Sequence, residues 1–305
     1  LFESIKDFRE RRANKHLYSI DQEKLKIIEG WPFIYWISDG FREKFKGKLV
    51  KNIINNKQGL ATTNNNKYLR LWWEIASIFK NSDKWFLYAK GGPYNKWYGN
   101  LWCVVNFEND GYEIKEEVKI RYPYLKGKTE FVVKNENYYF KKGITYSASG
   151  AKGPSYRYMP DNIIFDVGGS GIFPSNIFNN INYILSLFNS KIIGYIIDCL
   201  NPTVNTQAGD IERVPFVIPS KSKENSISNL ASKNIEIKKQ LCSYRIIETN
   251  YEQSPLIAFQ GASLKDRVLA YLNFENAQLT QVLINEAIIN ELIFEVYELS
   301  EADRE

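Results

Sequence analysis

The sequence has a single histidine, His16, and only three cysteines among its 305 residues. His16 lies in an expected helix among charged residues, so histidine-based catalytic triads and multi-histidine metal sites are both disfavoured. The cysteines, Cys103, Cys199 and Cys242, are odd in number, widely spaced and free of any Cys-x-x-Cys arrangement. The sequence therefore predicts neither a zinc site nor a disulfide framework, and it favours a reducing, cytoplasmic environment.

The sequence also lacks a long apolar run. The longest, residues 192–200, is interrupted by Gly194 and Asp198 and falls short of the ~20 residues that a membrane-spanning helix needs. It contains no signal peptide and no phosphate-binding Gly-x-x-x-x-Gly-Lys-Ser/Thr loop. The first residue is Leu1 and not methionine, which suggests a processed product or an excised piece of a longer protein. We expect no membrane partner.

Aromatic residues make up 15% of the chain, and its charges are unevenly distributed. Residues 41–157 hold 22 Lys and Arg against 10 Asp and Glu, whereas residues 246–305 hold 3 against 11. This asymmetry is typical of a basic binding face joined to an acidic part that stays away from nucleic acid or docks elsewhere. Solvated surface charge alone is the competing explanation.

Apolar periodicity and turn signals predict an α+β fold. We expect a helical lead-in over 1–29, a twisted and mostly antiparallel β domain with inserted helices over 30–219, and a helical region over 220–305. The boundary near residue 219 depends on the polar segment 220–226, which we interpret as a linker.

Strands are expected at residues 33–37, 85–89, 102–107, 112–118, 138–140, 163–167 and 211–218. Asn109-Asp110-Gly111 predicts a hairpin turn, because Asp-Gly readily adopts the positive φ values that such turns require. Helices are expected at about 177–188, 191–200, 227–242 and 279–296, where apolar residues have helical spacing. The second of these should end at Asn201-Pro202, because proline lacks an amide proton and disfavours helix in the residue before it.

The strand expected at 163–167 runs into the glycine-rich turn Gly168-Gly169-Ser170-Gly171. Such a junction begins many nucleotide and S-adenosylmethionine sites, because glycine lets backbone amides approach a ligand. Here Pro174 follows too soon for a helix to start, and no acidic residue ends a next strand about 20 residues on. We favour a tight turn that places backbone close to a neighbour. A small methyltransferase that uses this loop is the weaker alternative.

Three segments combine amide, hydroxyl, cationic and aromatic side chains: 62–70, 90–98 and 141–157. Lys and Arg suit phosphates and guanine edges, Asn and Gln suit adenine edges, and Tyr can stack or wedge. The segments therefore predict a nucleic-acid interface. The expected DNA-contacting residues are Thr62, Asn64, Asn66, Lys67, Arg70, Lys90, Tyr94, Lys96, Lys142, Tyr146, Lys152, Ser155, Tyr156 and Arg157. The tryptophans expected in the core are Trp72, Trp73, Trp85 and Trp102.

Several motifs follow one another in a familiar order from about Trp31 to the end of the chain. They are Gln58–Glu74, Lys90–Asn100, Asn106–Gly111, Gly143–Tyr146 and Leu200–Ile211. Together they resemble the C-terminal half of adenine-specific DNA methyltransferases, of the kind found in bacteriophage-exclusion (BREX) systems and in single-chain restriction-modification enzymes. Thr63 and Asn64 depart from the family pattern, which has glycine followed by aspartate there.

The resemblance implies a target recognition region, which reads the DNA site while a separate N-terminal domain binds S-adenosylmethionine and methylates adenine. It implies that this chain holds no catalytic, cofactor-binding or metal-binding residue. The implied partners are double-stranded DNA, the methyltransferase domain and other phage-defence proteins. The Gly168–Gly171 turn then becomes recognition scaffold. An alternative is a protein-interaction module that docks through its acidic helical end.

Overall fold

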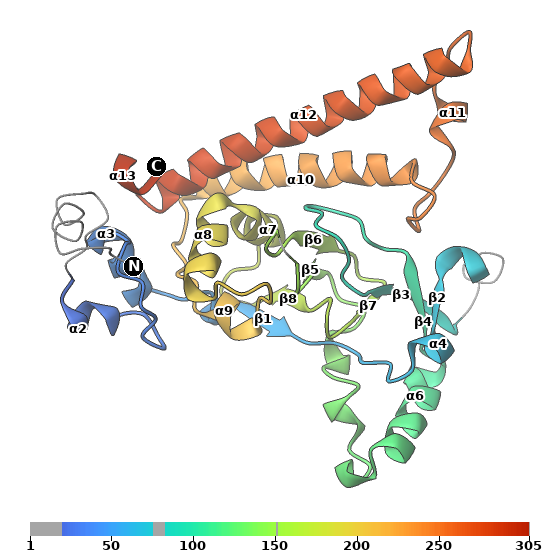
Figure 1. Ribbon diagram of the computed structural model, residues 1–305, viewed down its shortest axis with the longest axis horizontal. Coiled ribbons are helices and arrows are strands. Elements are labelled where there is room, and N and C mark those ends of the chain that lie inside the picture. The colour runs from blue at the N-terminus through green and yellow to red at the C-terminus, as the bar shows by residue number, and fades with distance from the viewer. Residues whose placement is uncertain (1–19, 76–82, 151, 305) are drawn as a thin grey trace, which may run out of the picture.

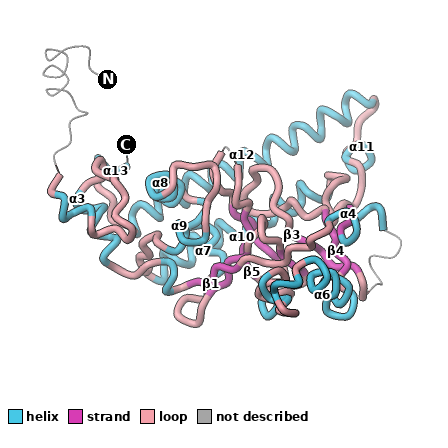
Figure 2. The backbone as a smooth tube through the Cα atoms, turned by 60° about the horizontal axis from the view of Figure 1, so that its bottom comes forward, coloured by secondary structure: helices cyan, strands magenta, loops and turns pink. Residues whose placement is uncertain are grey.

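The computed structural model describes residues 20–75, 83–150 and 152–304. Two small β-sheets lie at the centre, with helices around them (Figure 2). A pair of long helices runs along one side of the molecule, and a helical lobe projects on the opposite side (Figure 1). The predicted α+β class, with a mostly antiparallel β region and a helical C-terminal part, is confirmed.

The first sheet is antiparallel and has the strand order β1-β8-β5-β6. Its strands are β1 (Ile54–Lys57), β5 (Gly143–Tyr146), β6 (Tyr156–Met159) and β8 (Gly171–Pro174). The second sheet has the order β2-β4-β3-β7, in which β3 and β7 run parallel. Its strands are β2 (Leu69–Leu71), β3 (Trp85–Ala89), β4 (Cys103–Asn106) and β7 (Ile163–Phe165). The strands expected at 85–89, 102–107 and 163–167 are therefore confirmed.

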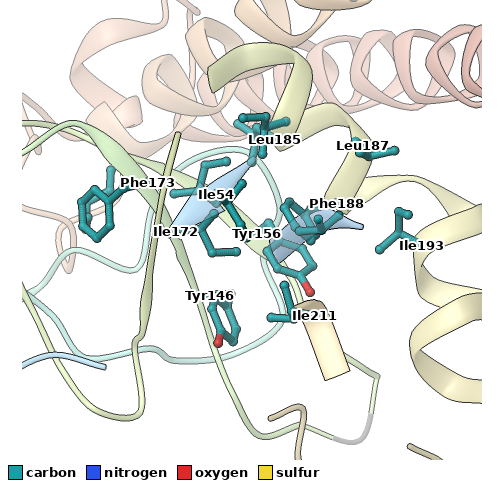
Figure 3. Close-up of a cluster of buried hydrophobic side chains, with 14 of the residues drawn as sticks. Ile54, Tyr146, Tyr156, Ile172, Phe173, Leu185, Leu187, Phe188, Ile193 and Ile211 are labelled. Atoms are coloured by element: carbon teal, nitrogen blue, oxygen red, sulfur yellow. The ribbon is translucent and has the colours of Figure 1, made fainter. Parts of the chain in front are cut away.

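One part of the core lies between the first sheet and two helices, α7 (Ile181–Asn189) and α8 (Lys191–Leu200), and the same core continues into the second sheet through Tyr88 and Ile164. Ile172 of β8 lies in this part of the core near Tyr156 and Phe188, whereas Phe173 points away from them (Figure 3) and contacts Phe165 of β7, with ring centroids 5.4 Å apart. Tyr156 stacks on Phe188 with ring centroids 4.8 Å apart. Complete burial of one such side chain stabilises the fold by about 1.5–3 kcal/mol.

Helices α7 and α8 confirm two predicted helices, and α8 ends at Leu200, immediately before Asn201-Pro202. No single helix in the described part of the chain is long and apolar enough to cross a membrane. Helices α7 and α8 reach the length and apolar character of a membrane-spanning helix only when they are taken together, and the chain bends by 63° between them.

The C-terminal part contains α9 (Ala208–Glu212), α10 (Lys221–Ser243), α11 (Pro255–Ala258), α12 (Leu264–Val296) and α13 (Glu301–Arg304). Helix α10 packs along both α7 and α12. The segment 220–226, expected as a linker, forms the first turns of α10, so that expectation is wrong. Ser220 caps the helix by accepting the backbone N–H of Lys223, and the half-exposed first turn explains why the segment is polar. The domain boundary near 219 stays a prediction.

The strand expected at 112–118 is wrong, because these residues belong to α6 (Glu108–Arg121). Asn109, Asp110 and Gly111 adopt the predicted positive φ values of 50°, 56° and 72°, but the turn leads into a helix and not back into a second strand. Ile114 and Val118, four residues apart, are buried beneath it. Helix α6 forms the projecting lobe with η4 (Pro123–Leu125) and η5 (Thr129–Phe131).

Three other expectations for the β region are wrong. Residues 33–37 form no strand, and the exposed Phe33 has no strand partner. Tyr138 ends the 3-10 turn η6 (Glu136–Tyr138), and Tyr139 and Phe140 follow it without forming a strand. Residues 211–218 contain the end of α9 and one isolated bridge from Pro215 to Leu49. Most of the predicted helical lead-in over 1–29 lies outside the described residues, and its described part contains the short helix α2 (Gln22–Leu25). Between the lead-in and β1 lie α3 (Asp39–Glu43), η1 (Lys44–Lys46) and η2 (Val50–Asn52).

Candidate nucleic-acid interface

The first predicted segment lies in α4 (Asn65–Tyr68) and the turn before it. Asn64 caps α4 by accepting the backbone N–H of Lys67. The Thr62 hydroxyl donates to Asn65 at 2.5 Å, and Thr62 is buried. Asn66 is exposed, whereas the guanidinium of Arg70 donates to the backbone carbonyls of Asn66 and Leu69. Asn66 is therefore available to a ligand, and Thr62 is not.

Lys67 is exposed but not electrostatically free. Its ammonium group lies 2.9 Å from the carboxylate of Glu117 in α6. Hydrogen bonds to Tyr68 and Glu117 raise the pKa of Lys67. The open groove beside it is lined by Glu113, Glu116 and Glu117 as well as by Arg121. A phosphate would meet this carboxylate cluster, so Lys67 is a weaker DNA contact than the sequence suggests.

The second predicted segment, 90–98, is mainly structural. Lys90 pairs with Asp166 at 3.1 Å. Lys96 donates to the backbone carbonyl of Asn189 at 3.0 Å and lies 3.4 Å from Glu286 of α12. Tyr94 is 46% exposed. The two lysines hold parts of the chain together, and Tyr94 keeps a ring at the surface.

Most of the predicted DNA-contacting residues of the third segment, 141–157, are buried and not at the surface. Tyr146, Ser155, Tyr156 and Arg157 are each 1% exposed. These side chains are buried in the core because they lie on or beside the buried strands β5 and β6. Tyr146 packs on Tyr156 with ring centroids 5.4 Å apart. These residues, like Thr62, are scaffold in this structure and not surface groups that DNA can reach.

The buried guanidinium of Arg157 is held by local oxygen atoms. It donates to the carbonyls of Asn95 and Ser155 and to the hydroxyls of Ser147 and Ser155, at 3.2–3.3 Å. Burial lowers the pKa of Arg157 to about 10. It is a structural cross-link between the loop at 90–98 and β6.

Two lysines of the third segment are exposed, Lys142 and Lys152. Lys142 lies 3.8 Å from Asp161, with both side chains more than 60% exposed. An exposed pair of this length is weak, so its lysine can be recruited by a phosphate. The tryptophans are divided: Trp85 is buried, as expected, whereas Trp73 is 43% exposed.

The space beside the glycine-rich turn Gly168–Gly171 is occupied by backbone atoms of the same chain. A Cβ atom on Gly169 would lie 2.3 Å from the carbonyl oxygen of Ala89 at the end of β3, so only glycine fits there. Asp166 at the start of the turn accepts hydrogen bonds from Tyr88 and Lys90. This close packing supports the tight-turn interpretation.

A cluster of basic and amide side chains surrounds Tyr138, and the sequence did not predict that these side chains come together. We define the Tyr138 cluster as Lys57, Gln58, Lys134, Asn135, Tyr138 and Lys141. The ammonium groups of Lys57 and Lys141 lie 5.5 and 5.3 Å from the centroid of the Tyr138 ring. The Tyr138 ring also packs on the core, because it contacts the buried Phe173 of β8 with ring centroids 4.8 Å apart.

Hydrogen bonds to Gln58 hold the cluster together. Lys134 donates to the Gln58 side chain at 2.8 Å, and Asn135 donates to the Gln58 backbone carbonyl at 2.8 Å. Among the described residues, Lys57, Lys134 and Lys141 have no carboxylate within 4 Å. Glu136, within the same segment, is paired with Lys115. Within the described part of the chain, two positive charges without a counter-charge therefore lie beside the Tyr138 ring, and Lys134 adds a third next to Gln58.

Sequence reasoning missed this cluster for a geometric reason. Lys57 ends β1, whereas Lys134, Tyr138 and Lys141 follow the projecting lobe, and only the chain's return to β5 brings them beside β1. The local signal was the Lys141-Lys142 pair, which we included in the predicted segment 141–157, whereas we assigned the preceding residues 138–140 to a strand. Among the described residues, no group of three or more His, Cys, Asp or Glu side chains is placed to hold a metal ion.

The chain is similar to two curated adenine-specific methyltransferases. It is 32% identical over 314 residues to adenine-specific methyltransferase BrxX of Escherichia coli O9:H4 (strain HS), covering 97% of this chain and 24% of that protein. It is 30% identical over 214 residues to adenine-specific methyltransferase PglX of Lacticaseibacillus casei (strain Zhang), covering 66% and 17%. The predicted resemblance to adenine-specific methyltransferases is confirmed, and the chain spans a quarter or less of these relatives' length.

Among solved structures, the type IIL restriction-modification enzyme MmeI in complex with DNA aligns with 81% of this chain and 33% of its own. The TM-score is 0.47 and the sequence identity is 10%. No protein-family profile matches the chain.

Proposed function

We propose that this chain is the target recognition part of a site-specific adenine DNA methyltransferase in restriction-modification or phage defence. Similarity along 97% of the chain to one adenine-specific methyltransferase supports the enzyme class. The chain corresponds to about a quarter of that relative. We assign S-adenosylmethionine binding and adenine methylation to a portion of the protein outside this chain, and double-stranded DNA is the proposed ligand of the chain itself.

The observation that carries DNA binding is the Tyr138 cluster. Lysines without a counter-charge neutralise phosphates and release counterions from DNA, which supplies most of the sequence-independent affinity. A half-buried tyrosine between them can pack on a sugar or an unstacked base. Gln58 and Asn135 add amide groups beside the cations. Contacts of this kind position the duplex, and the exposed Asn66 and Tyr94 are the proposed base-reading side chains.

Salt-titrated binding to labelled duplexes tests this function. The logarithm of affinity should fall linearly with the logarithm of salt concentration. Replacing Lys57 and Lys141 with alanine should make that slope shallower by about 2, since each phosphate contact contributes roughly 0.9. Lys233→Ala removes an exposed lysine from α10 and is the matched control, expected to leave the slope unchanged. An affinity that is independent of salt, or equal losses in both variants, would contradict the proposal.

Calorimetry with S-adenosylmethionine separates this proposal from a small methyltransferase that uses the Gly168 turn. We expect no heat of binding for the chain, because the backbone of β3 occupies the space beside Gly169. Stoichiometric binding that is lost when Gly169 is replaced by alanine in a folded variant would support the methyltransferase alternative.

A further inference from the structure

Helix α12 has few charged residues on its exposed side, where a surface helix normally carries them. Between residues 268 and 290 it carries only two charged residues, Glu275 and Glu286. Glu275 lies 3.5 Å from Arg245 and accepts the hydroxyl of Tyr271, and Glu286 accepts the indole N–H of Trp97. Both carboxylates are thus used for contacts within the chain. The part of the surface that α12 exposes over these 23 positions has no charge.

The exposed positions form one continuous strip. Leu283 is 65% exposed, Ile284 49% and Leu269 46%. Positions spaced by three and four residues lie on one side of a helix, and the exposed residues follow this spacing. We define the α12 strip as Leu269, Leu272, Asn273, Asn276, Ala277, Thr280, Leu283, Ile284, Ala287 and Ile288, all of which are exposed.

The opposite face of α12 already has its partners. Val282, Asn285, Ile289 and Ile293 are buried, and Asn285 donates to Asn234 of α10 at 2.7 Å. Helix α12 lies along the side of the molecule away from the projecting lobe (Figure 1). The strip is therefore a second surface, which no element of the described chain covers and which is separate from α6.

We propose that the α12 strip is the docking face for an α-helix of the methyltransferase portion. The identity of this occupant rests on the proposed function. Apolar side chains lie at both ends of the strip, and uncharged polar groups, Asn273, Asn276 and Thr280, lie in the middle. The fitting helix has apolar residues at the same three-and-four spacing and one uncharged hydrogen-bonding side chain near its centre, because a buried polar pair fixes helix register.

Three observations favour this occupant. The strip has no charge, so a charged partner such as DNA would lose solvation without gaining an ion pair. The curated relatives are at least four times as long as the aligned region, which leaves a large protein surface that a recognition part must be held against. The strip also lies away from α6, so docking there leaves that side of the β region open. The acidic docking surface expected from the sequence stays a separate prediction.

Thiol accessibility provides the test. Thr280→Cys is introduced into this chain alone and into the longer polypeptide that contains its methyltransferase portion, and the rate of maleimide labelling at position 280 is followed by peptide mass spectrometry. We expect labelling to be at least tenfold slower in the longer polypeptide. Lys128→Cys, an exposed position beyond α6, is the control and should label at equal rates in both.

A disruptive variant makes the result specific to the strip. Leu283→Asp in the longer polypeptide should restore fast labelling at position 280, and in this chain alone it should leave the melting temperature and the DNA affinity within experimental error. Equal labelling of Thr280→Cys in both polypeptides overturns the proposal. Protection in the isolated chain, with a dimer mass by light scattering, overturns it in favour of a second copy as occupant. A DNA-binding failure in the unsubstituted chain would instead count against the proposed function alone.

Discussion

The indole Nε1 of Trp97 donates to the Glu286 carboxylate across 2.6 Å, joining the loop before β4 to the middle of α12. Trp97 is 1% exposed, so Glu286 is the acceptor that allows its N–H to be buried. Lys96 lies 3.4 Å from the same carboxylate. The basic and acidic blocks of the sequence are therefore in direct contact here.

Replacing Glu286 with alanine should lower the free energy of unfolding by about 1–3 kcal/mol, because the Trp97 N–H is left buried without an acceptor. Glu286→Gln keeps an acceptor oxygen and should lower the free energy of unfolding by a smaller amount. Urea denaturation followed by tryptophan fluorescence measures both. Equal stability of the wild type and Glu286→Ala would show that the contact contributes nothing.

Replacing Thr63 with glycine should stabilise the chain. Thr63 has φ +61°, and its buried hydroxyl has no hydrogen-bond partner among the residues that the structure describes. A β-branched residue is strained in this region by roughly 1–2 kcal/mol, and the greater chain entropy of glycine offsets part of the gain. We expect a net increase of up to about 1 kcal/mol by thermal melting. Thr203→Gly, in an exposed loop, is the control, and a loss of stability in Thr63→Gly alone would refute the strain.

Stability should fall in acid partly through Glu117. Hydrogen bonds from Tyr68 and Lys67 lower the pKa of the Glu117 carboxyl below 4.5. A depressed carboxyl pKa stabilises the fold above the unfolded value, and this stabilisation is lost as pH falls below about 4.5. Glu117→Gln should therefore lose less stability than the wild type between pH 6 and pH 3, measured as the urea midpoint. Parallel curves for the two proteins would exclude this contribution.

The native protein should expose one reactive thiol. Burial raises the pKa of Cys103 and, helped by Glu248, raises the pKa of Cys242 to about 12. Burial also raises the pKa of Cys199, but Cys199 is partly exposed whereas the other two cysteines are buried. At pH 8 a thiol-specific chromogenic disulfide should titrate one cysteine, and Cys199→Ser should remove it, whereas all three should react in denaturant. Rapid reaction of Cys242 in the native protein would contradict its burial.

The sequence predicted elements whose signal is local. Apolar runs identified β3, β4 and β7, helical spacing identified α7, α8, α10 and α12, and proline marked the end of α8. The turn at Asn109–Gly111 shows the limit, because positive φ values were predicted correctly but do not decide whether a strand or a helix follows. That choice was made by burial of Ile114 and Val118 against the rest of the fold.

The candidate interface was harder to predict, because polar composition does not reveal which polar groups are used internally. Arg157 and Lys96 have the chemistry of DNA contacts, yet they hydrogen-bond to backbone carbonyls of the same chain. Lys57 and Lys141 are distant in sequence and meet only at Tyr138. The charge block indicated that a basic surface exists, and tertiary pairing determined which lysines remain unpaired.

The pairing of β1 with β8 has a consequence for how the chain acquires its structure. Ile54 is opposite Pro174, and β5 and β6 complete the same sheet only after β8 joins it. Pairings between segments this far apart form slowly, since a long loop must close first. During synthesis the basic end of β1 must wait, unpaired, until residues beyond 174 have left the ribosome. Shortening the chain from its C-terminal side to before β8 would therefore leave β1 without its partner strand and disconnect it from β5 and β6, which pair directly with each other.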